Sequence, residues 1–215
     1  MAKLRVGVLI SGRGTNLKAL LDTCQTPSFP AEIVAVVSNR PDAAGLGHAR
    51  ALGVPVIALD HKAYPSREAF DDALHDALRM AGVEFVCLAG YMRLLTAAFI
   101  ARWQDRIINI HPSLLPSFRG LNAHEQALAA GVKLAGCTVH IVRPEVDSGP
   151  ILVQAAVPVL DGDDVDSLAA RILEAEHKIY PLALKLVAEQ RVRIVGDKAF
   201  IDGEQPLGML LSPAS

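Results

Sequence analysis

The sequence is short of cysteine and aromatic residues and contains no long hydrophobic run. Its cysteines, Cys24, Cys87 and Cys137, are too few and too widely spaced for a disulfide framework or a zinc site. No two histidines have metal-ligand spacing with a carboxylate or a cysteine, so no metal is expected. No apolar stretch approaches the roughly 20 residues of a membrane span. The N-terminal residues lead straight into a short strand without a signal-peptide pattern, so we expect a cytoplasmic protein that does not bind membranes.

Neither sign of charge is in excess. The chain has 21 Lys and Arg against 23 Asp and Glu, for a formal net charge of -2. The basic residues are scattered, which disfavours a nucleic-acid surface and favours small molecules as partners. With 215 residues, of which 51% are hydrophobic, we expect a single domain over 1–215, with a core at about 4–202 and a mobile tail at 205–215. A monomer and a homodimer are both open.

The first half of the chain alternates apolar runs with helical patterns. We predict strands at 4–10, 32–37, 54–59, 84–89 and 106–110. Helices are expected between them at 16–23, 43–52, 67–80 and 96–103. The clearest is 67–80, because Phe70, Leu74 and Leu78 share one face, Pro65 and Ser66 stand at its start and Gly82 follows its end. This alternation predicts a Rossmann-like α/β fold, with a mostly parallel central sheet and helices on both faces.

The pattern changes after residue 111. A helix is expected at 123–130, followed by strands at 136–142 and 151–159 that form an antiparallel C-terminal hairpin on the sheet. A long helix should start near Asp164 with Asp163 as a cap, and Pro181 should kink or end it. A small hairpin is predicted over Gly196-Asp197, between 191–195 and 199–202.

A glycine-containing loop, Ser11-Gly12-Arg13-Gly14-Thr15-Asn16, lies between the first strand and the first helix. Its glycines allow close approach of the backbone, and the helix N-terminus supplies donors for an anion such as a phosphate. It matches neither the dinucleotide fingerprint nor the Walker A loop. An ordinary tight turn is the alternative.

A second polar group follows the predicted strand 106–110. Asn109 and His111 are two residues apart, so an extended backbone points both side chains to one face. An amide donor beside a charged imidazole suits an oxyanion that forms on a carbonyl, and a nearby carboxylate such as Asp147 would favour the charged imidazole. Spacing alone does not show that Asp147 meets His111. The alternative for each of the three is a structural residue. His124 and His140 are candidates to line the same pocket, but the structural interpretation is favoured for both.

Six motifs, in order along about residues 4–202, resemble the phosphoribosylglycinamide formyltransferase family. They are the glycine loop 11–16, Leu88-Ala89-Gly90-Tyr91-Met92-Arg93-Leu94-Leu95, Asn109-Ile110-His111-Pro112-Ser113-Leu114-Leu115-Pro116, Gly136-Cys137-Thr138-Val139-His140, Asp147-Ser148-Gly149-Pro150 and Glu176-His177-Lys178-Ile179-Tyr180-Pro181. The resemblance implies transfer of the formyl group of 10-formyltetrahydrofolate, a co-substrate, to the primary amine of glycinamide ribonucleotide in de novo purine biosynthesis.

The same resemblance implies roles for individual residues. Those that match the family's catalytic residues are Asn109, His111 and Asp147. Those implied for the ribonucleotide are Gly14, Thr15, Asn16 and Glu176. Those implied for the folate are Arg67, Met92, Arg93, Leu94, Leu95, Asn109, Arg143, Pro144, Glu145, Val146 and Asp147. The chain departs from the family at Leu173, where relatives often carry a polar or basic residue near the phosphate, and at Asn122, where some carry histidine.

Three other readings share parts of this pattern. Methionyl-tRNA formyltransferase carries a further C-terminal barrel and a basic surface, which we do not expect in a slightly acidic chain of this length. Formyltetrahydrofolate hydrolase carries an N-terminal regulatory domain, which we do not expect because the first strand begins at Leu4. A non-catalytic folate- or nucleotide-binding module is the alternative from another class, and the complete set of Asn109, His111 and Asp147 argues against it.

Overall fold

The computed structural model describes residues 2–203, so the predicted mobile tail lies outside the described residues. The described chain forms two compact units, one of residues up to Asn109 together with Ile141–Pro144, the other of Ile110–His140 and the residues from Glu145 onward. The single domain expected over 1–215 stays a prediction. Among the described residues, no helix combines the length and apolar character that crossing a membrane requires.

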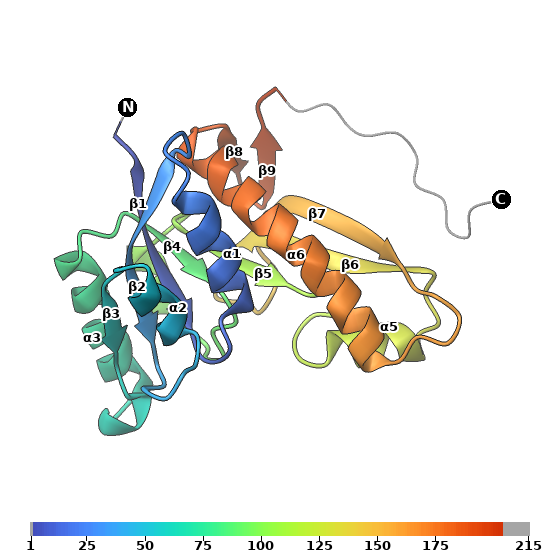
Figure 1. Cartoon of the computed structure of the whole chain (residues 1–215), viewed down its shortest axis with the longest axis horizontal. Helices are drawn as coiled ribbons and strands as arrows, with labels where there is room; N and C mark the ends of the chain where they lie inside the picture. The colour runs from blue at the N-terminus through green and yellow to red at the C-terminus, as the bar shows by residue number, and fades with distance from the viewer. Residues whose placement is uncertain (1, 204–215) are drawn as a thin grey trace. The chain divides into compact units, whose positions relative to one another are not determined.

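The described strands form a mostly parallel sheet, drawn in Figure 1. In the first half of the chain the strands are β1 (Leu4–Ile10), β2 (Ala31–Ser38), β3 (Val56–Ala58), β4 (Phe85–Leu88) and β5 (Ile107–His111). Those of the second half are β6 (Leu134–Ile141) and β7 (Ile151–Pro158). The sheet order is β3-β2-β1-β4-β5-β6-β7, in which β1 to β5 pair in parallel and β6 pairs antiparallel to β7. The predicted Rossmann-like sheet with an antiparallel hairpin is confirmed.

Helices cover both faces of the sheet in the first unit. Leu9 of β1 lies in one apolar cluster with Phe70 and Leu74 of α3 (Arg67–Met80) and with Phe99 of α4 (Ala97–Arg102). Side chains alternate along a strand, so the fully buried Val8 faces the opposite side, where α1 (Thr15–Cys24) and α2 (Leu46–Ala51) contact β2. The short 3-10 helix η1 (His61–Ala63) precedes α3. Helix α3 matches its prediction at both ends, because Ser66 accepts from the Ala69 N–H and Gly82 follows in the left-handed region.

The second unit contains α5 (Ala123–Ala129), α6 (Val165–Ala188) and a small antiparallel sheet of β8 (Val192–Val195) and β9 (Lys198–Ile201). Helix α6 contacts β7 and α5, as Figure 1 shows. The apolar side of α6 is buried, and the helix packs against β7 of the hairpin.

The structure contradicts the predicted cap of α6 and one of the two outcomes predicted for Pro181, the end of the helix. The helix is capped by Asp164, not Asp163, because Asp164 is the extended residue whose carboxylate accepts from the Ser167 N–H at 2.8 Å. Asp163 instead pairs with Arg171. Pro181 does not end the helix, which continues to Ala188; Pro181 and Leu184 are buried, and this packing outweighs the lost hydrogen bond. Strand β5 also extends one residue further than predicted and includes His111.

The hairpin of β6 and β7 has no space for a side chain at Gly136. A Cβ there would overlap the carbonyl oxygen of Ala155 on β7. We therefore expect Gly136→Ala to lower the free energy of unfolding by about 1–3 kcal/mol, as overpacking does, measured by urea denaturation. Gly47→Ala in α2 is the matched control, because its Cβ meets nothing within 4 Å, and it should leave stability equal or higher. Equal stability of the two variants would contradict this explanation.

Candidate active site

The loop after β1 leads into the N-terminus of α1, which has no side-chain cap. Gly14 is the N-cap of α1, with φ 74°, and no side chain caps the helix there. A Cβ on Gly14 would lie 2.7 Å from the Cα of Gly45, so both the backbone angle and the close approach require glycine. Thr15 and Asn16 open the helix and Arg13 is exposed. This arrangement is suited to an anion.

The segment after β4 alternates in exposure. Met92 and Leu94 are 70% and 57% exposed, whereas Leu95 packs against the apolar cluster and the Arg93 guanidinium lies 4.5 Å from the centre of the Phe70 ring. The segment therefore offers two apolar side chains outward while the residues beside them hold it to the core. Arg67, at the start of α3, is exposed.

A buried acid that the sequence analysis missed holds the far end of this segment. Asp71 is 2% exposed, and its carboxylate accepts from the Thr96 N–H at 2.7 Å. The sequence carried no signal for it, since an Asp beside Phe70 on a predicted amphipathic helix resembles a surface residue. Its burial is set by the tertiary contact with Thr96.

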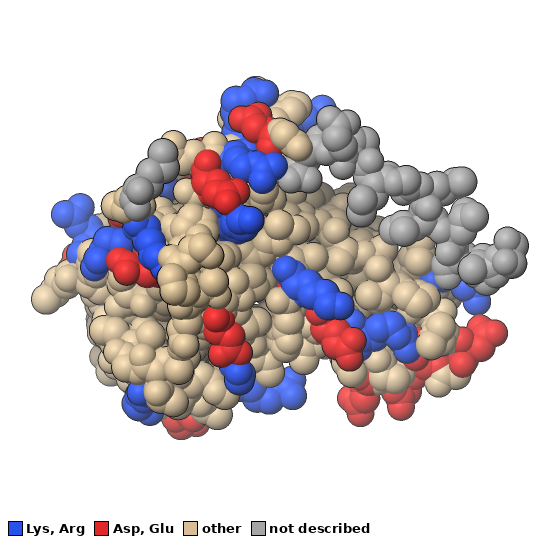
Figure 2. Space-filling view, turned by 45° about the horizontal axis from the view of Figure 1, so that its top comes forward, with Lys and Arg blue, Asp and Glu red and all other residues tan. Residues whose placement is uncertain are grey.

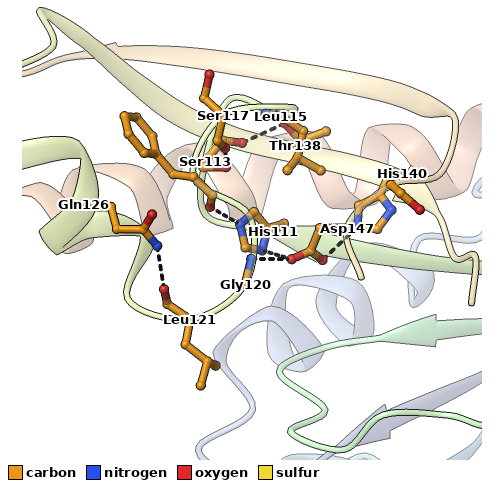
Figure 3. Close-up of polar contacts among 12 residues, drawn as sticks. His111, Ser113, Leu115, Ser117, Gly120, Leu121, Gln126, Thr138, His140 and Asp147 are labelled. Atoms are coloured by element: carbon orange, nitrogen blue, oxygen red, sulfur yellow. Dashed lines mark hydrogen bonds and ion pairs between the residues drawn. The ribbon is translucent and has the colours of Figure 1, made fainter. Parts of the chain in front are cut away.

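In the second unit, two histidine side chains contact the carboxylate of one aspartate, as Figure 3 shows. Asp147, in the connection between β6 and β7, lies 3.3 Å from Nδ1 of His111 through Oδ2 and 3.6 Å from Nε2 of His140 through Oδ1. The Gly120 N–H donates to Oδ2 of Asp147 at 2.8 Å. The carboxylate side chain is 10% exposed. Asp147 thus meets His111, as the sequence alone had left open, and His140 joins them.

The contacts of Asp147 favour its charged form. Burial acts to raise the pKa of Asp147, but the contact with His140, the hydrogen bond from Gly120 and the charge of His111 together lower it below the ordinary value. Asp147 also has φ 49°, a backbone angle that Asp tolerates better than most residues. The contacts and the backbone angle therefore both favour an ionised Asp at position 147.

Both ring nitrogens of His111 face oxygen acceptors. Nε2 lies 2.9 Å from the carbonyl oxygen of Phe118, and Nδ1 faces the Asp147 carboxylate. Neither oxygen can donate, so a ring that bonds to both must carry a hydrogen on each nitrogen, which is the imidazolium. The geometry therefore suits a positively charged His111.

The remaining predicted site residues are placed as follows. Asn109 lies two residues before His111 on β5 and pairs with Leu88 of β4 in the sheet register. Glu176, on α6, is 7% exposed, and its charge adds to the burial that raises the pKa of Cys137 to about 12. The Arg143 side chain is held by Asp105 at 2.6 Å, whereas the three residues that follow it, Pro144, Glu145 and Val146, are exposed. Among residues 2–203, no cluster of three or more His, Cys, Asp or Glu side chains is arranged to hold a metal.

Comparison with known proteins decides the family. The sequence model described as formyl transferase matches residues 4–184. The chain belongs to the formyl transferase family. The phosphoribosylglycinamide formyltransferase of Escherichia coli (strain K12) is 43% identical over 202 residues, which cover 94% of this chain and 95% of that protein. The crystal structure of glycinamide ribonucleotide transformylase 1 from Symbiobacterium toebii has a TM-score of 0.91 and 55% identity, covering 93% of this chain and 94% of that one.

Other members of the formyl transferase family are much longer. The trifunctional purine biosynthetic protein adenosine-3 of Bos taurus is 52% identical over 192 residues, which cover 89% of this chain but 19% of that protein. This chain therefore spans 14% to 19% of the length of the trifunctional relatives that it matches. A formyltetrahydrofolate deformylase from Pseudomonas syringae is 28% identical, with a TM-score of 0.85, covering 93% of this chain and 66% of that one.

The contact of His140 with Asp147 has a measurable consequence. His140→Ala removes a contact that favours the charged Asp147, so the pKa of Asp147 should rise toward its ordinary value of about 3.9. A carboxylate with a lowered folded-state pKa contributes stability above its unfolded pKa and loses it as pH falls through the folded value. In the variant this contribution should be smaller, and its loss should be complete at a higher pH, because the folded-state pKa lies closer to the unfolded one. Carbon-13 NMR titration of the Asp147 carboxyl measures the change.

His75→Ala is the control for this titration. His75 lies on α3 and accepts from Nε1 of Trp103, and it is not among the groups that shift the pKa of Asp147. The control should leave the Asp147 titration as in the unmodified protein. An unchanged Asp147 pKa in His140→Ala would refute the contribution of His140.

Proposed function

We propose that this chain transfers the formyl group of 10-formyltetrahydrofolate to the primary amine of glycinamide ribonucleotide. The products are N-formylglycinamide ribonucleotide and tetrahydrofolate. The observation that carries the proposal is the buried contact of Asp147 with His111 in a member of the formyl transferase family, with Asn109 on the same strand. The relatives named as phosphoribosylglycinamide formyltransferases, which match nearly their whole length, support this choice of substrates.

Formyl transfer to an amine requires a hydrogen-bond donor to an oxyanion, a general acid and a general base. The amine nitrogen attacks the formyl carbon, and the carbonyl oxygen becomes an oxyanion in a tetrahedral intermediate. Asn109 donates a hydrogen bond to that oxygen, and charged His111 stabilises it. The bond from carbon to the folate N10 then breaks as N10 takes the proton from Nε2 of His111, which turns from the Phe118 carbonyl to the substrate when the substrate is bound. Asp147 keeps His111 charged and, through water, helps to take the proton that leaves the amine.

The substrate assignments follow the family motifs. Gly14, Thr15 and Asn16 bind the 5′-phosphate at the N-terminus of α1, and Glu176 contacts the ribonucleotide. The segment Met92 to Leu95, with Arg67, binds the folate, and the stretch Arg143 to Asp147 surrounds its pteridine ring. The exposed Met92 and Leu94 support this, because a flat heterocycle binds well on apolar side chains. Arg13 compensates for the cation that Leu173 does not supply.

The expected partners are these small molecules alone. Lys and Arg lie among Asp and Glu over much of the face seen in Figure 2, which does not favour a polyanion such as nucleic acid. We propose a cytoplasmic protein without membrane or nucleic-acid partners, as a monomer or a homodimer.

One assay separates this function from its neighbours. The protein is mixed with 10-formyltetrahydrofolate, with and without glycinamide ribonucleotide, and release of tetrahydrofolate is followed. Release that depends on the ribonucleotide supports the transferase. Release without it supports the hydrolase reading, which the likeness to the Pseudomonas deformylase keeps in view. No release in either mixture supports a binding module.

Substitution of each of the three proposed catalytic residues by alanine should reduce turnover in this assay. We expect about 10²- to 10³-fold for Asn109→Ala, which loses an oxyanion donor, and about 10²- to 10⁴-fold for His111→Ala and Asp147→Ala. Circular dichroism checks that each variant is folded. Asp72→Asn, which loses an exposed ion pair with Arg102, is the control and should keep full turnover. Near-normal turnover in all three alanine variants would remove the assignment.

The glycine loop gives a separate test of the ribonucleotide site. In Gly14→Val the new side chain meets the backbone of Gly45 and has an unfavourable φ, so the loop must move away from the helix N-terminus. Ribonucleotide affinity should fall by 10-fold or more, roughly the loss of one charge-assisted hydrogen bond. Calorimetric titration of folate alone is the internal control, and equal losses for both ligands would contradict the assignment.

A further inference from the structure

A single buried hydroxyl connects the two loops to which the two substrates are assigned. Ser11, the first residue of the glycine loop, is 4% exposed. Its Oγ donates to Oδ1 of Asn39 at 2.5 Å and accepts from the Met92 N–H at 2.8 Å. The Ser11 N–H donates in turn to the Gly90 carbonyl at 3.1 Å. Two hydrogen bonds therefore join the glycine loop to the segment that contains Met92 and Leu94.

The position of Ser11 in the sheet explains why it can do this. Ser11, Asn39 and Gly90 follow the carboxyl ends of β1, β2 and β4, which are neighbours in the order β2-β1-β4. The chain leaves β1 in one direction along the sheet and returns on its other side at β4, so β1 and β4 form the topological switch point where ligands bind in such folds. Ser11 lies across that point.

Ser11 is not placed to touch a substrate. Its hydrogen is used by Asn39 and its oxygen by Met92, and the side chain is buried. Asn39 is also held through its backbone, since its backbone carbonyl oxygen lies 2.8 Å from Nδ1 of His61. The Ser11 hydroxyl is thus a part of the frame, unlike the exposed residues Gly12 and Arg13 that follow it.

We propose that Ser11 is a positioning residue that couples the binding of ribonucleotide and folate. This inference rests on the proposed function. Both loops have exposed residues that lose freedom when a ligand orders them. The Ser11 hydrogen bonds connect the two loops, so the ligand that binds first to one loop also partly orders the other. The second ligand then loses less conformational entropy on binding and binds more tightly. By linkage the effect is the same in both directions.

The far end of the folate segment is fixed independently. The Thr96 N–H donates to the carboxylate of Asp71, a contact that does not involve the glycine loop, so we expect only the end at Met92 to respond to the state of that loop. Coupling should therefore depend on the Ser11 hydroxyl, and affinity for folate alone should depend on it much less.

Double titration tests the proposal. The dissociation constant of tetrahydrofolate, which has no formyl group to transfer, is measured by calorimetry with and without saturating glycinamide ribonucleotide. For the unmodified protein we expect tetrahydrofolate to bind about 5-fold or more tightly in the presence of the ribonucleotide, within the usual range of coupling between sites. In Ser11→Ala, which loses the hydroxyl bond to Met92 and keeps the backbone bond to Gly90, this ratio should fall toward one, although the variant still binds each ligand alone.

Two further variants keep the result interpretable. Ser38→Ala is the matched control, because Ser38 is a buried serine at the end of β2 whose hydroxyl bonds only within its own turn, to the backbone of Arg40. It should keep the full ratio. Ser11→Cys preserves the shape but offers a weak acceptor, so it serves if Ser11→Ala does not fold, and its ratio should be reduced.

The failures are distinguishable. A ratio of one in the unmodified protein, or an unchanged ratio in both Ser11 variants, overturns the coupling while the enzyme still releases tetrahydrofolate in a ribonucleotide-dependent way. Loss of the ratio in Ser38→Ala as well overturns the specific role of Ser11. Absence of ribonucleotide-dependent release in the unmodified protein overturns the proposed function and this inference with it.

Discussion

The carboxylate of Asp147 is the contact on which the proposed chemistry depends. A side chain that is 10% exposed would take up a proton or turn to water unless donors surrounded it. Those donors come from β5 through His111, from the loop after β5 through Gly120, and from β6 through His140. The antiparallel hairpin therefore adds more than strands to the sheet, because its connection carries the acid and its first strand carries one of the donors.

The first unit meets a different constraint, which is space. Gly14 and Gly45 bring two backbones so close that no side chain fits between them, and the helix α1 begins without a side-chain cap. A capping Ser or Asp would satisfy the first N–H groups and stabilise the helix, but it would also occupy the donors that an anion needs. The loop lacks the local stabilisation that such a cap would give. The neighbouring residue Ser11 shows the opposite arrangement, with every polar atom of its side chain already paired.

Local signals predicted the fold well and the site only in part. Helix α3 was predicted at both ends, because its start, its apolar face and its terminating glycine are all written within a few residues. Asp163 and Asp164 are both good caps, so the choice depended on backbone angles that the sequence does not contain. The approach of Asp147 to His111, the part of His140 and the burial of Asp71 all depend on contacts between segments far apart in the chain. The family motifs indicated the first of these, and nothing indicated the last.

A transfer between two substrates requires both to be held at the same time, and the fold offers one economical way to arrange that. In an open parallel sheet the loops at the switch point come from adjacent strands, so their first residues are near enough to share hydrogen bonds. Read as sequence, Ser11 is one more donor in a glycine loop that faces a ligand. In the structure it is buried and turned toward Asn39 and Met92, so its contribution is to the frame. Residues of this kind touch neither substrate, yet the relative placement of the two loops depends on them.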